Sequence, residues 1–552
     1  MDNNEIKRRL ARLESDRQVI QDTWDIIEKF VVPYRGEFFE DNKSENEIDW
    51  RTRELFDSTA VMAAQTLASS VHGSLTSPAT KWFDLRFRDD NLNTNKEAKS
   101  WLEEVGKAIY FALYDSNFNL EVSEVYLDLV SFGTACIIEE FEGDMLTGKD
   151  FKLNFKSVPV KEIYFEQDHK GQVCSLYRKL EWSAIQIVDK FGKDGVPADI
   201  FEKSENSTSA STKMTVVYSI TKRNFGMEQP EDDGGHKAPE LRPYEFKYML
   251  LTTCETLGEA GGYYEMPAFI PRWRVTSESQ WGNSPAMIAL PDIMTVNQLT
   301  ELILRATEKV VDPATMVTER GLLSDLDLEA GGLSVVRNLD DIKVHESRAR
   351  FDVSDLQREK LRESINHIFY VDQLELKESP SMTATEVQVR YELMQRLLGP
   401  TAGRIIDNML DPTIQRTFTG MLRAGQFPPM PEILKGTAAD LDIQYIGPLS
   451  RAQKVDQQAA TERWLAGLVG MAEMDPTVME VPDFDMIARD SADTLNVPAK
   501  YMKTKEKLNK DRKDKQAAQS EQNQIIQAQE GGAAMKAVGE GTAAIQGAQS
   551  GQ

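Results

Sequence analysis

The stretch Ser284–Asp312, SPAMIALPDIMTVNQLTELILRATEKVVD, predicts one long amphipathic helix around which the rest of the chain can be ordered. Apolar residues recur in it at steps of three and four, which places them on one face of a helix. Pro291 suits the first turn and Pro313 marks the end. From Asp292 to Val311 such a helix would span about 30 Å. Its apolar face consists of Ile293, Val296, Leu299, Ile303, Ala306 and Val310.

A small insert separates this helix from a second one. Three short runs in the insert, MVTE, LSVVR and DIKVH, predict strands, and Gly331-Gly332 is typical of a turn. The second helix is expected to begin at Ser354, which forms a capping-box pattern with Gln357. The apolar face of this second helix consists of Leu361, Ile365 and Ile368.

A polar stretch, QLELKESPSM, comes next and leads into a long helix. Thr383 and Glu386 form a second capping box at the start of TEVQVRYELMQRLL. Gly399-Pro400 and Asp411-Pro412 are expected to kink or interrupt the helix that follows. The order is therefore helix, small insert, helix, polar loop and long kinked helix.

The N-terminal part combines helices with a β region. Apolar residues from Ile6 to Ile27 have helical spacing, and DSTAVMAAQTLASSVHGSL predicts a second helix with Asp57 or Ser58 as its N-cap. We interpret His72, within it, as a structural residue. A short strand is expected in KWFDLRF. Between about residues 135 and 280 the period changes to two, which predicts strands interrupted by one or two helices such as SAIQIVDKFG.

The C-terminal part is expected to contain one strand, in DLDIQYIGPL, and helices from about residue 450 to 515. A basic cluster between Lys503 and Lys515 then leads into a tail rich in Gln, Ala and Gly. This segment is either a solvated helix that ends in a disordered tail, or a helix that orders against copies of itself or packaged nucleic acid. The predicted fold class is α+β, mainly helical.

The amino-acid composition argues against several classes of protein, among them tight DNA binders, disulfide-rich scaffolds and membrane proteins. The 552 residues include 64 Lys and Arg against 89 Asp and Glu, a formal net charge of −25, so most of the surface would repel DNA. Three widely spaced cysteines exclude a disulfide scaffold and suit a reducing compartment. No run of eighteen apolar residues predicts a membrane span, and the first residues are too polar for a secretory signal.

One motif is similar to the phosphate-binding loop of nucleotide-binding proteins. Gly143–Asp150, GDMLTGKD, is one residue away from the phosphate-binding pattern G-x-x-x-x-G-K-[ST]. That pattern needs a helix after its lysine, whose amides bind phosphate, and a hydroxyl for the metal ion. Here Asp150 replaces the hydroxyl, and both flanks alternate as strands. We therefore predict a hairpin connection and no nucleotide site.

Catalytic and metal-binding patterns are also missing from the sequence. The five histidines lie far apart, none in a metal-ligand spacing, and no G-x-S-x-G elbow occurs. Acidic pairs such as Glu139-Glu140 carry little information in so acidic a chain. We expect no enzyme activity, no cofactor and no metal.

Four long stretches, spread from about Asp57 to Lys454, carry a family resemblance. They are LFDSTAVMAAQTLASSVHGSLTSPATKWFDLRF, WGNSPAMIALPDIMTVNQLTELILRATEKVVDPA, SMTATEVQVRYELMQRLLGPTAGRI and IQYIGPLSRAQK. Together with the order of elements, they resemble the portal (head-to-tail connector) proteins of short-tailed, podovirus-type bacteriophages.

The resemblance implies the portal fold, which assembles as a ring of twelve subunits around a DNA channel. It divides the chain into a wing (1–282), a first stem helix (283–311), a clip (312–353), a second stem helix (354–372), a channel loop (373–383), a kinked wing helix (384–429), a crown (430–502) and a C-terminal barrel helix or disordered tail (503–552).

The resemblance also implies partners and a location. Double-stranded DNA would pass through the ring non-specifically during packaging and ejection. The ring would bind the terminase ATPase and later the tail adaptor or nozzle, and it would contact major capsid, scaffolding and internal core proteins. It would nucleate procapsid assembly in the host cytoplasm and would be located at the portal vertex of the finished virion. No membrane partner is expected.

A channel that passes any DNA sequence should not bind phosphate strongly, so isolated positive groups become candidate sites. In the channel loop we single out Lys377 for transient phosphate contact, although an ordinary exposed lysine is the alternative. Its loop neighbours are Glu378, Ser379, Ser381 and Met382, and Lys309 near the end of the first stem helix is a further channel or stem candidate. The clip candidates for intersubunit or partner contacts are Arg320, Arg337, Arg348 and Arg350.

Two other function classes stay open. A scaffolding or adaptor protein of the virion would bind partners without forming a channel. An enzyme assembled from residues far apart in the sequence would show activity, such as ATP hydrolysis, in purified protein.

Overall fold

The structure is a computed structural model. It describes residues 2–34, 54–78, 81–89, 92–93, 95–143, 148–206, 209–224, 237–276, 279–311, 315–317, 342–344, 351–374, 399–434, 441–445, 460–468, 481–482, 484, 486–488 and 491. The chain divides into two compact units, which are described separately. The first comprises residues 1–83, 107–427 and 445–449, and the second comprises 84–106, 428–444 and 450–552.

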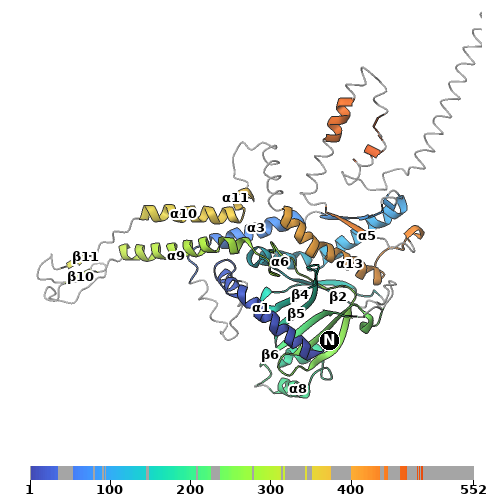
Figure 1. Ribbon diagram of the computed structural model, residues 1–552, viewed down its shortest axis with the longest axis horizontal. Helices are drawn as coiled ribbons and strands as arrows, with labels where there is room; N and C mark the ends of the chain where they lie inside the picture. The colour runs from blue at the N-terminus through green and yellow to red at the C-terminus, as the bar shows by residue number, and fades with distance from the viewer. Residues whose placement is uncertain are drawn as a thin grey trace, which may run out of the picture. The chain divides into compact units, whose positions relative to one another are not determined.

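An antiparallel five-stranded sheet, in the order β4-β5-β6-β7-β8, forms the largest β element of the first unit (Figure 1). Helix α1, Asn3–Phe30, packs Ile6, Leu10 and Leu13 on one face of this sheet. The predicted first helix and the strands of the β region are confirmed. The strands are β4 (Ile163–Gln167), β5 (Val173–Ser183), β6 (Lys213–Lys222), β7 (Tyr244–Leu250) and β8 (Thr256–Tyr263).

A smaller antiparallel sheet has the order β3-β2-β9. Strand β2 (Ile137–Glu142) pairs along its length with β3 (Lys152–Ser157), and its first two residues pair with β9 (Ala268–Phe269). The GDMLTGKD stretch connects β2 to β3, and a strand follows Lys149 where a phosphate loop would need a helix. The predicted hairpin is therefore confirmed.

Helices surround these sheets in the first unit. Helix α3 (Thr59–Leu75), as predicted, packs against α6 (Phe118–Phe132), where Thr76 and Tyr126 share a 3.1 Å hydrogen bond. Two short helices interrupt the β region as expected, α7 (Ala184–Phe191) and α8 (Ala198–Glu205). The 3-10 turns are η2 (Val160–Glu162) and η3 (Pro239–Leu241). Helix α6 was not predicted, and neither was α5 (Lys96–Asp115), of which residues 96–106 belong to the second unit.

The expected long helix is α9, Pro285–Val311, which begins two residues after the predicted bound at 283 and ends at the predicted residue 311. Pro291 lies inside the helix, so its expected place in the first turn is wrong. Pro285 occupies that turn instead, where a missing N–H costs nothing because the first helical N–H groups have no acceptor within the helix. The buried face of α9 contains the predicted Ile293 and Val296.

The second helix, α10, begins earlier than predicted. It spans Phe351–Ile368, so Ser354 lies within the helix and the expected capping box at its start is wrong. Figure 1 shows α10 alongside α9, with the strands β10 (Thr315–Val317) and β11 (Ile342–Val344) at their shared end. These strands pair antiparallel and confirm two of the three predicted in the insert. A short helix, α11 (Val371–Leu374), follows α10.

The last helical stretch of the first unit changes geometry in its middle. Residues 399–405 are helical through Gly399-Pro400, a π-helical segment covers Ile406–Leu410, and α13 covers Asp411–Arg423. Pro412 lies in the first turn of α13. The expected interruption at Asp411-Pro412 thus takes the form of a π segment, a common cause of helix bending. The predicted capping box at Thr383 lies outside the described residues.

The second unit contains a two-stranded sheet of β1 (Phe83–Phe87) and β12 (Leu441–Tyr445), and both strands were predicted. The indole of Trp101 donates a 3.1 Å hydrogen bond to the carbonyl of Pro428, just before the 3-10 turn η6 (Glu432–Leu434). Residues 460–468 are helical. The basic cluster and the tail lie outside the described residues.

Candidate functional site: the helix pair α9 and α10

The start of α9 is fixed against the end of α6. The Ser284 hydroxyl accepts from the Met287 N–H at 3.0 Å, which caps the helix, and donates to the Ser131 carbonyl at 2.7 Å. Just before it, the Trp281 ring lies edge-on to the rings of Trp24 and Phe165. All of these rings are buried, so the base of the helix pair is held in an aromatic core.

A charged contact fixes α10 to the segment before α3. Arg362 donates from Nε and Nη2 to one carboxylate oxygen of Asp57, at 2.9 and 2.7 Å. The other oxygen accepts from the Thr59 N–H at 3.0 Å. Burial raises the pKa of Asp57, but the hydrogen bonds from Thr59 and Arg362 outweigh it and hold the pKa below its ordinary value. The carboxylate therefore stays charged and can hold α10.

An amide side chain fixes α9 to the same segment. The carbonyl oxygen of Asn297 accepts from the N–H groups of Phe56 and Asp57, and its NH₂ donates to the Glu54 carbonyl at 2.9 Å. The two helices are also joined directly, because the Ser364 hydroxyl donates to the Asp292 carboxylate at 2.8 Å. Asp57 and Asn297 thus form an anchor that sets α9 and α10 relative to the body of the unit.

The part of α9 beyond this anchor exposes large apolar side chains. Leu302, Leu304 and Val310 are each about half exposed, and Val311 is 79% exposed. On α10, Leu356 is 61% exposed. A run of such residues along one projecting helix pair is typical of a protein interface. Nearer the base, Ile288 and Met294 extend the exposed apolar surface of α9.

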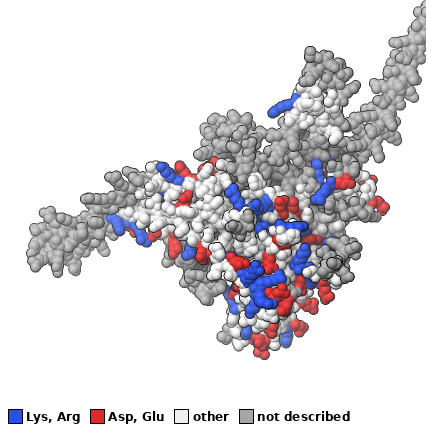
Figure 2. Space-filling model, in the orientation of Figure 1, with Lys and Arg blue, Asp and Glu red and all other residues white. Residues whose placement is uncertain are grey.

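Charges on the described surface are mixed in sign. Figure 2 shows lysine and arginine next to aspartate and glutamate over the described part of the face in view. On the helix pair, Arg305 pairs with Glu301 and Arg358 pairs with Asp355 within their own helices. A protein that binds DNA tightly needs a basic face, and neither this view nor the net charge provides one.

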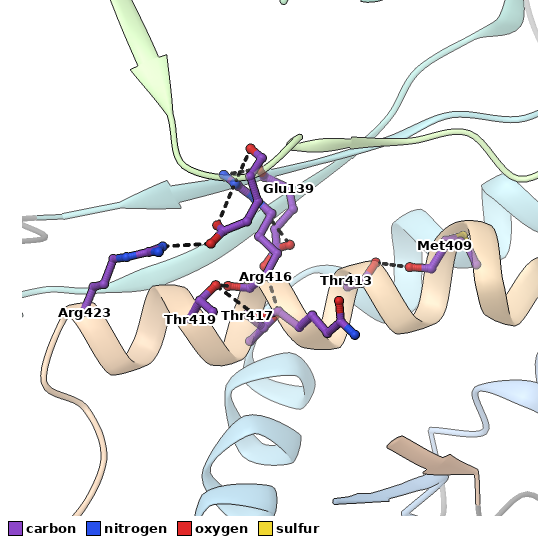
Figure 3. A network of polar contacts seen from close by, with 9 residues as sticks. Glu139, Met409, Thr413, Arg416, Thr417, Thr419 and Arg423 are labelled. Atoms are coloured by element: carbon purple, nitrogen blue, oxygen red, sulfur yellow. Dashed lines mark hydrogen bonds and ion pairs between the residues drawn. The ribbon is translucent and has the colours of Figure 1, made fainter. Parts of the chain in front are cut away.

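A second polar network fixes α13 to the small sheet (Figure 3). The Glu139 side chain is fully buried, and its Oε1 accepts from the Thr417 hydroxyl at 2.8 Å. Arg416 Nε lies 3.6 Å from Glu139 Oε2, which is close enough for an ion pair and too long for a hydrogen bond. Burial raises the pKa of Glu139 to about 8, against the opposing effect of Arg416.

The same network extends to the segment after β8. Arg416 Nη1 donates to the Glu265 carbonyl at 3.0 Å, and Arg423 Nη1 donates to the Glu265 carboxylate at 2.9 Å. The Arg423 guanidinium also lies 4.0 Å from the centre of the Tyr264 ring. These contacts make α13 part of the β-sheet body.

The structure describes only one of the candidate residues named from the sequence. Lys309 lies exposed in the last turn of α9, with Glu308 beside it in sequence. Nine candidates lie outside the described residues. They are Arg320, Arg337, Arg348 and Arg350 of the insert and Lys377, Glu378, Ser379, Ser381 and Met382 of the polar loop.

Residues of the anchor were not identified from the sequence. Asn297 interrupts the apolar face of α9, and a polar residue in such a stripe is a signal that it has a buried partner. Asp57 was identified only as a possible N-cap, and the carboxylate does receive the Thr59 N–H. Nothing in the sequence pairs it with Arg362.

Among the described residues, no histidine, cysteine and carboxylate side chains gather in a group that could hold a metal ion. No helix within the described ranges has both the length and the apolar composition needed to cross a bilayer. His72 is half-buried beside the Tyr126 ring, and its partial burial lowers its pKa. The helix pair α9 and α10, which its anchor holds in place, is the part of the unit suited to contact other proteins.

Comparisons with known proteins agree with this description. A sequence profile of the family described as "Bacteriophage head to tail connecting protein" matches residues 3–502. The chain is 28% identical over 508 residues to the "Probable portal protein" of Bordetella phage BPP-1, which covers 89% of this chain and 86% of that protein. It is 26% identical over 493 residues to the "Portal protein" of Salmonella phage epsilon15, covering 87% and 84%. The resemblance seen in the sequence is thereby confirmed, and the chain belongs to the bacteriophage head to tail connecting protein family.

Proposed function

We propose that this chain is the subunit of a portal, a closed ring of twelve copies at one capsid vertex. Double-stranded DNA enters the capsid through its central channel during packaging and leaves through it during ejection. The family assignment supports this role, and so do the names of the two relatives. A connector of this kind works mechanically, with the energy supplied by a separate ATPase.

The observation that carries the proposal is the exposed apolar surface of α9 beyond its anchor. Leu302, Leu304 and Val310 would each be stabilised by leaving water, at about 25 cal/mol per Å² of apolar surface buried. A projecting helix pair that repeats around a rotation axis can bury this surface against the next copy, and such head-to-tail contacts close into rings.

The elements of the first unit fit the portal regions in order. We propose α9 and α10 as the two stem helices, residues 312–353 with β10 and β11 as the clip, and residues 373–383 as the channel loop. The wing comprises residues 1–282 and the kinked helix at 384–429. The crown comprises 430–502, and 503–552 form a barrel helix or tail.

The partners follow from this arrangement. The clip, with Arg320, Arg337, Arg348 and Arg350, binds the terminase ATPase first and the tail adaptor or nozzle later. Other surfaces contact major capsid, scaffolding and internal core proteins as the ring nucleates procapsid assembly in the host cytoplasm. DNA passes Lys309 and the channel loop without sequence preference, and the acidic chain keeps that contact weak.

Electron microscopy of the purified protein tests the proposal. The wild-type chain should form closed rings with a central hole, and Leu302→Glu should give mostly monomers with unchanged helix content by circular dichroism. Gln298→Glu is the matched control, because it places the same charge at an exposed position of the same helix without removing an apolar side chain. Wild-type protein without rings would contradict the portal proposal.

The alternative is a scaffolding or adaptor protein that binds virion partners without a channel. It would also use the exposed apolar surface, but its assemblies would lack a central opening. The presence or absence of that hole in averaged images separates the two functions.

A further inference from the structure

The first unit contains an open polar groove of about 700 Å³ beside the turn between β4 and β5. Its walls come from four parts of the chain: that turn, the segment after β9, the residues before α9, and the helix that includes residues 399–405. Two arginines line it, Arg272 and Arg404, together with Lys170. Most other lining residues carry neutral amide or hydroxyl groups, and Asp407 is the one acidic residue among the described lining.

Arg272 is poorly satisfied for a buried cation. Arg272 is 8% exposed. Its guanidinium donates only to the carbonyls of Gln280 and Gly171, at 3.3 and 3.5 Å. Within the described part of the chain its Nε has no hydrogen-bond partner and no carboxylate lies within ion-pair distance of it. A buried charge without a counter-charge is unfavourable.

A structural arginine of the same chain provides a comparison. Arg17 is also buried and, like Arg272, does not donate from Nε. It donates from Nη1 to three carbonyls, with the shortest contact at 2.7 Å to Lys161, and its guanidinium lies 4.0 Å from the centre of the Tyr164 ring. Arg17 is therefore held by its own surroundings. Arg272 has two longer contacts and faces a groove that contains a second cation.

That second cation is Arg404. Its Nη1 makes one long contact, 3.5 Å to the Trp273 carbonyl, and its other donors remain available to the groove. Burial and then the charge of Arg404 lower the pKa of Arg272. Two guanidinium groups that repel each other across a groove are stabilised when an anion binds between them.

We propose that the Arg272–Arg404 groove is a binding site for a phosphate group, either inorganic phosphate or a phosphodiester of a nucleic-acid backbone. Arginine presents paired donors that match the oxygens of phosphate. Neutral donors such as those of Gln167, Thr276 and Ser279 are also typical of phosphate contacts. The groove is open and far larger than one phosphate, so it can admit a chain as well as an ion. The proposal does not depend on the ring.

Titration of the full-length protein with sodium phosphate tests the site, with affinity measured by calorimetry and by the shift in melting temperature. Phosphate should bind the wild type, bind Arg404→Gln at least tenfold more weakly, and bind Arg404→Lys with intermediate affinity because lysine keeps the charge without the paired donors. Arg12→Gln is the control, because it removes one exposed positive charge of α1 away from the groove. Equal phosphate affinity of Arg404→Gln and the wild type would overturn the proposal.

A short DNA duplex, titrated at several salt concentrations, identifies the source of the phosphate. If the site takes the nucleic-acid backbone, Arg404→Gln should reduce the slope of log K against log salt by about 1. An unchanged slope together with lost phosphate binding assigns the site to free phosphate. Rings that fail to assemble in Arg404→Gln, with no phosphate bound by the wild type, would overturn the proposal in favour of a carboxylate from a second copy. Wild-type images without rings would contradict the portal function alone.

Discussion

The backbones of Gly133 and Gly282 lie directly against each other at the base of α9. A Cβ on Gly133 would clash with the Gly282 carbonyl, and a Cβ on Gly282 would clash with the Gly133 carbonyl. Gly133 also has a left-handed backbone, with φ of 76°, where it ends α6. Because Ser284 follows two residues later, this contact sets where the long helix starts.

We predict that Gly133→Ala lowers the free energy of unfolding by more than about 2 kcal/mol, because left-handed strain of about 1–2 kcal/mol adds to the backbone clash. Gly425→Ala is the control. It has a similar φ of 64° but open space around the added methyl group, so it should cost only the strain. Urea unfolding measures both. Equal costs would show that the Gly133–Gly282 contact is unimportant.

The Asp57–Arg362 anchor yields a second prediction. Arg362→Ala leaves the buried Asp57 carboxylate without its cation, which should lower the free energy of unfolding by roughly 1–3 kcal/mol. Arg305→Ala breaks an exposed pair within α9 and should change it by less than about 0.5 kcal/mol. Thermal unfolding of the two variants compares them. A similar loss in both would argue against the anchor.

The Glu139–Arg416 pair can be tested by a double-mutant cycle. Above pH 8, where Glu139 is ionised, Arg416→Met should be strongly destabilising, by about 3–5 kcal/mol, because it leaves a buried carboxylate without a counter-charge. Adding Glu139→Leu should recover much of that loss, since an apolar pair has no charge to desolvate. If the two changes are additive, the residues do not interact energetically.

Glu139 should also make stability depend on pH. Its pKa is raised to about 8 by burial, from an ordinary value near 4.5, so the folded state holds a proton that the unfolded state has lost between these values. Its contribution is therefore complete below about pH 4.5 and is lost as the pH rises through 8. Urea unfolding at pH 5.5 and 8.5 should show a stability difference that shrinks in Glu139→Gln. The same slope in both proteins would assign the effect to other groups.

For the proposed channel loop, Lys377→Ala should leave ring assembly intact and lower the amount of DNA packaged per head. The physical reason is the loss of a weak, sequence-independent phosphate contact in an otherwise acidic chain. Packaging by heads assembled with the variant portal measures it, with Lys309→Ala as a comparison at the end of α9. Unchanged packaging would remove Lys377 from the candidates.

Periodicity predicted much of the fold. The three-and-four spacing of Ile6, Leu10 and Leu13 identified α1, and strict alternation identified most strands of the β region. The start of α10 was predicted late and Pro291 was wrongly placed in the first turn of α9, because Ser354 and Pro291 resemble start signals that these helices carry inside them. Local signals can be overridden where a tertiary contact, here that of Ser284 with Ser131, caps the helix earlier.

The polar contacts were beyond the reach of pattern reasoning. Asp57 and Arg362 are 305 residues apart, and in a chain with 89 acidic residues no local rule chooses one partner over another. For that reason the sequence pair Glu139-Glu140 is uninformative, and only the burial of Glu139 against Arg416 gives it a role. Arg272 and Arg404 likewise meet only because β9 and the helix near residue 400 fold together.

The sequence by itself determined the family, the order of helices and strands, and the hairpin in place of a phosphate loop at GDMLTGKD, because these depend on local periodicity and on long matching stretches. Only the tertiary structure decided which contacts cap the start of α9, which charges are paired, and that Arg272 and Arg404 share a groove. Those features depend on the distances between segments remote in the chain. These distances are set by the packing of α6 against α9 and the small sheet, and by the polar contacts of α13 with that sheet.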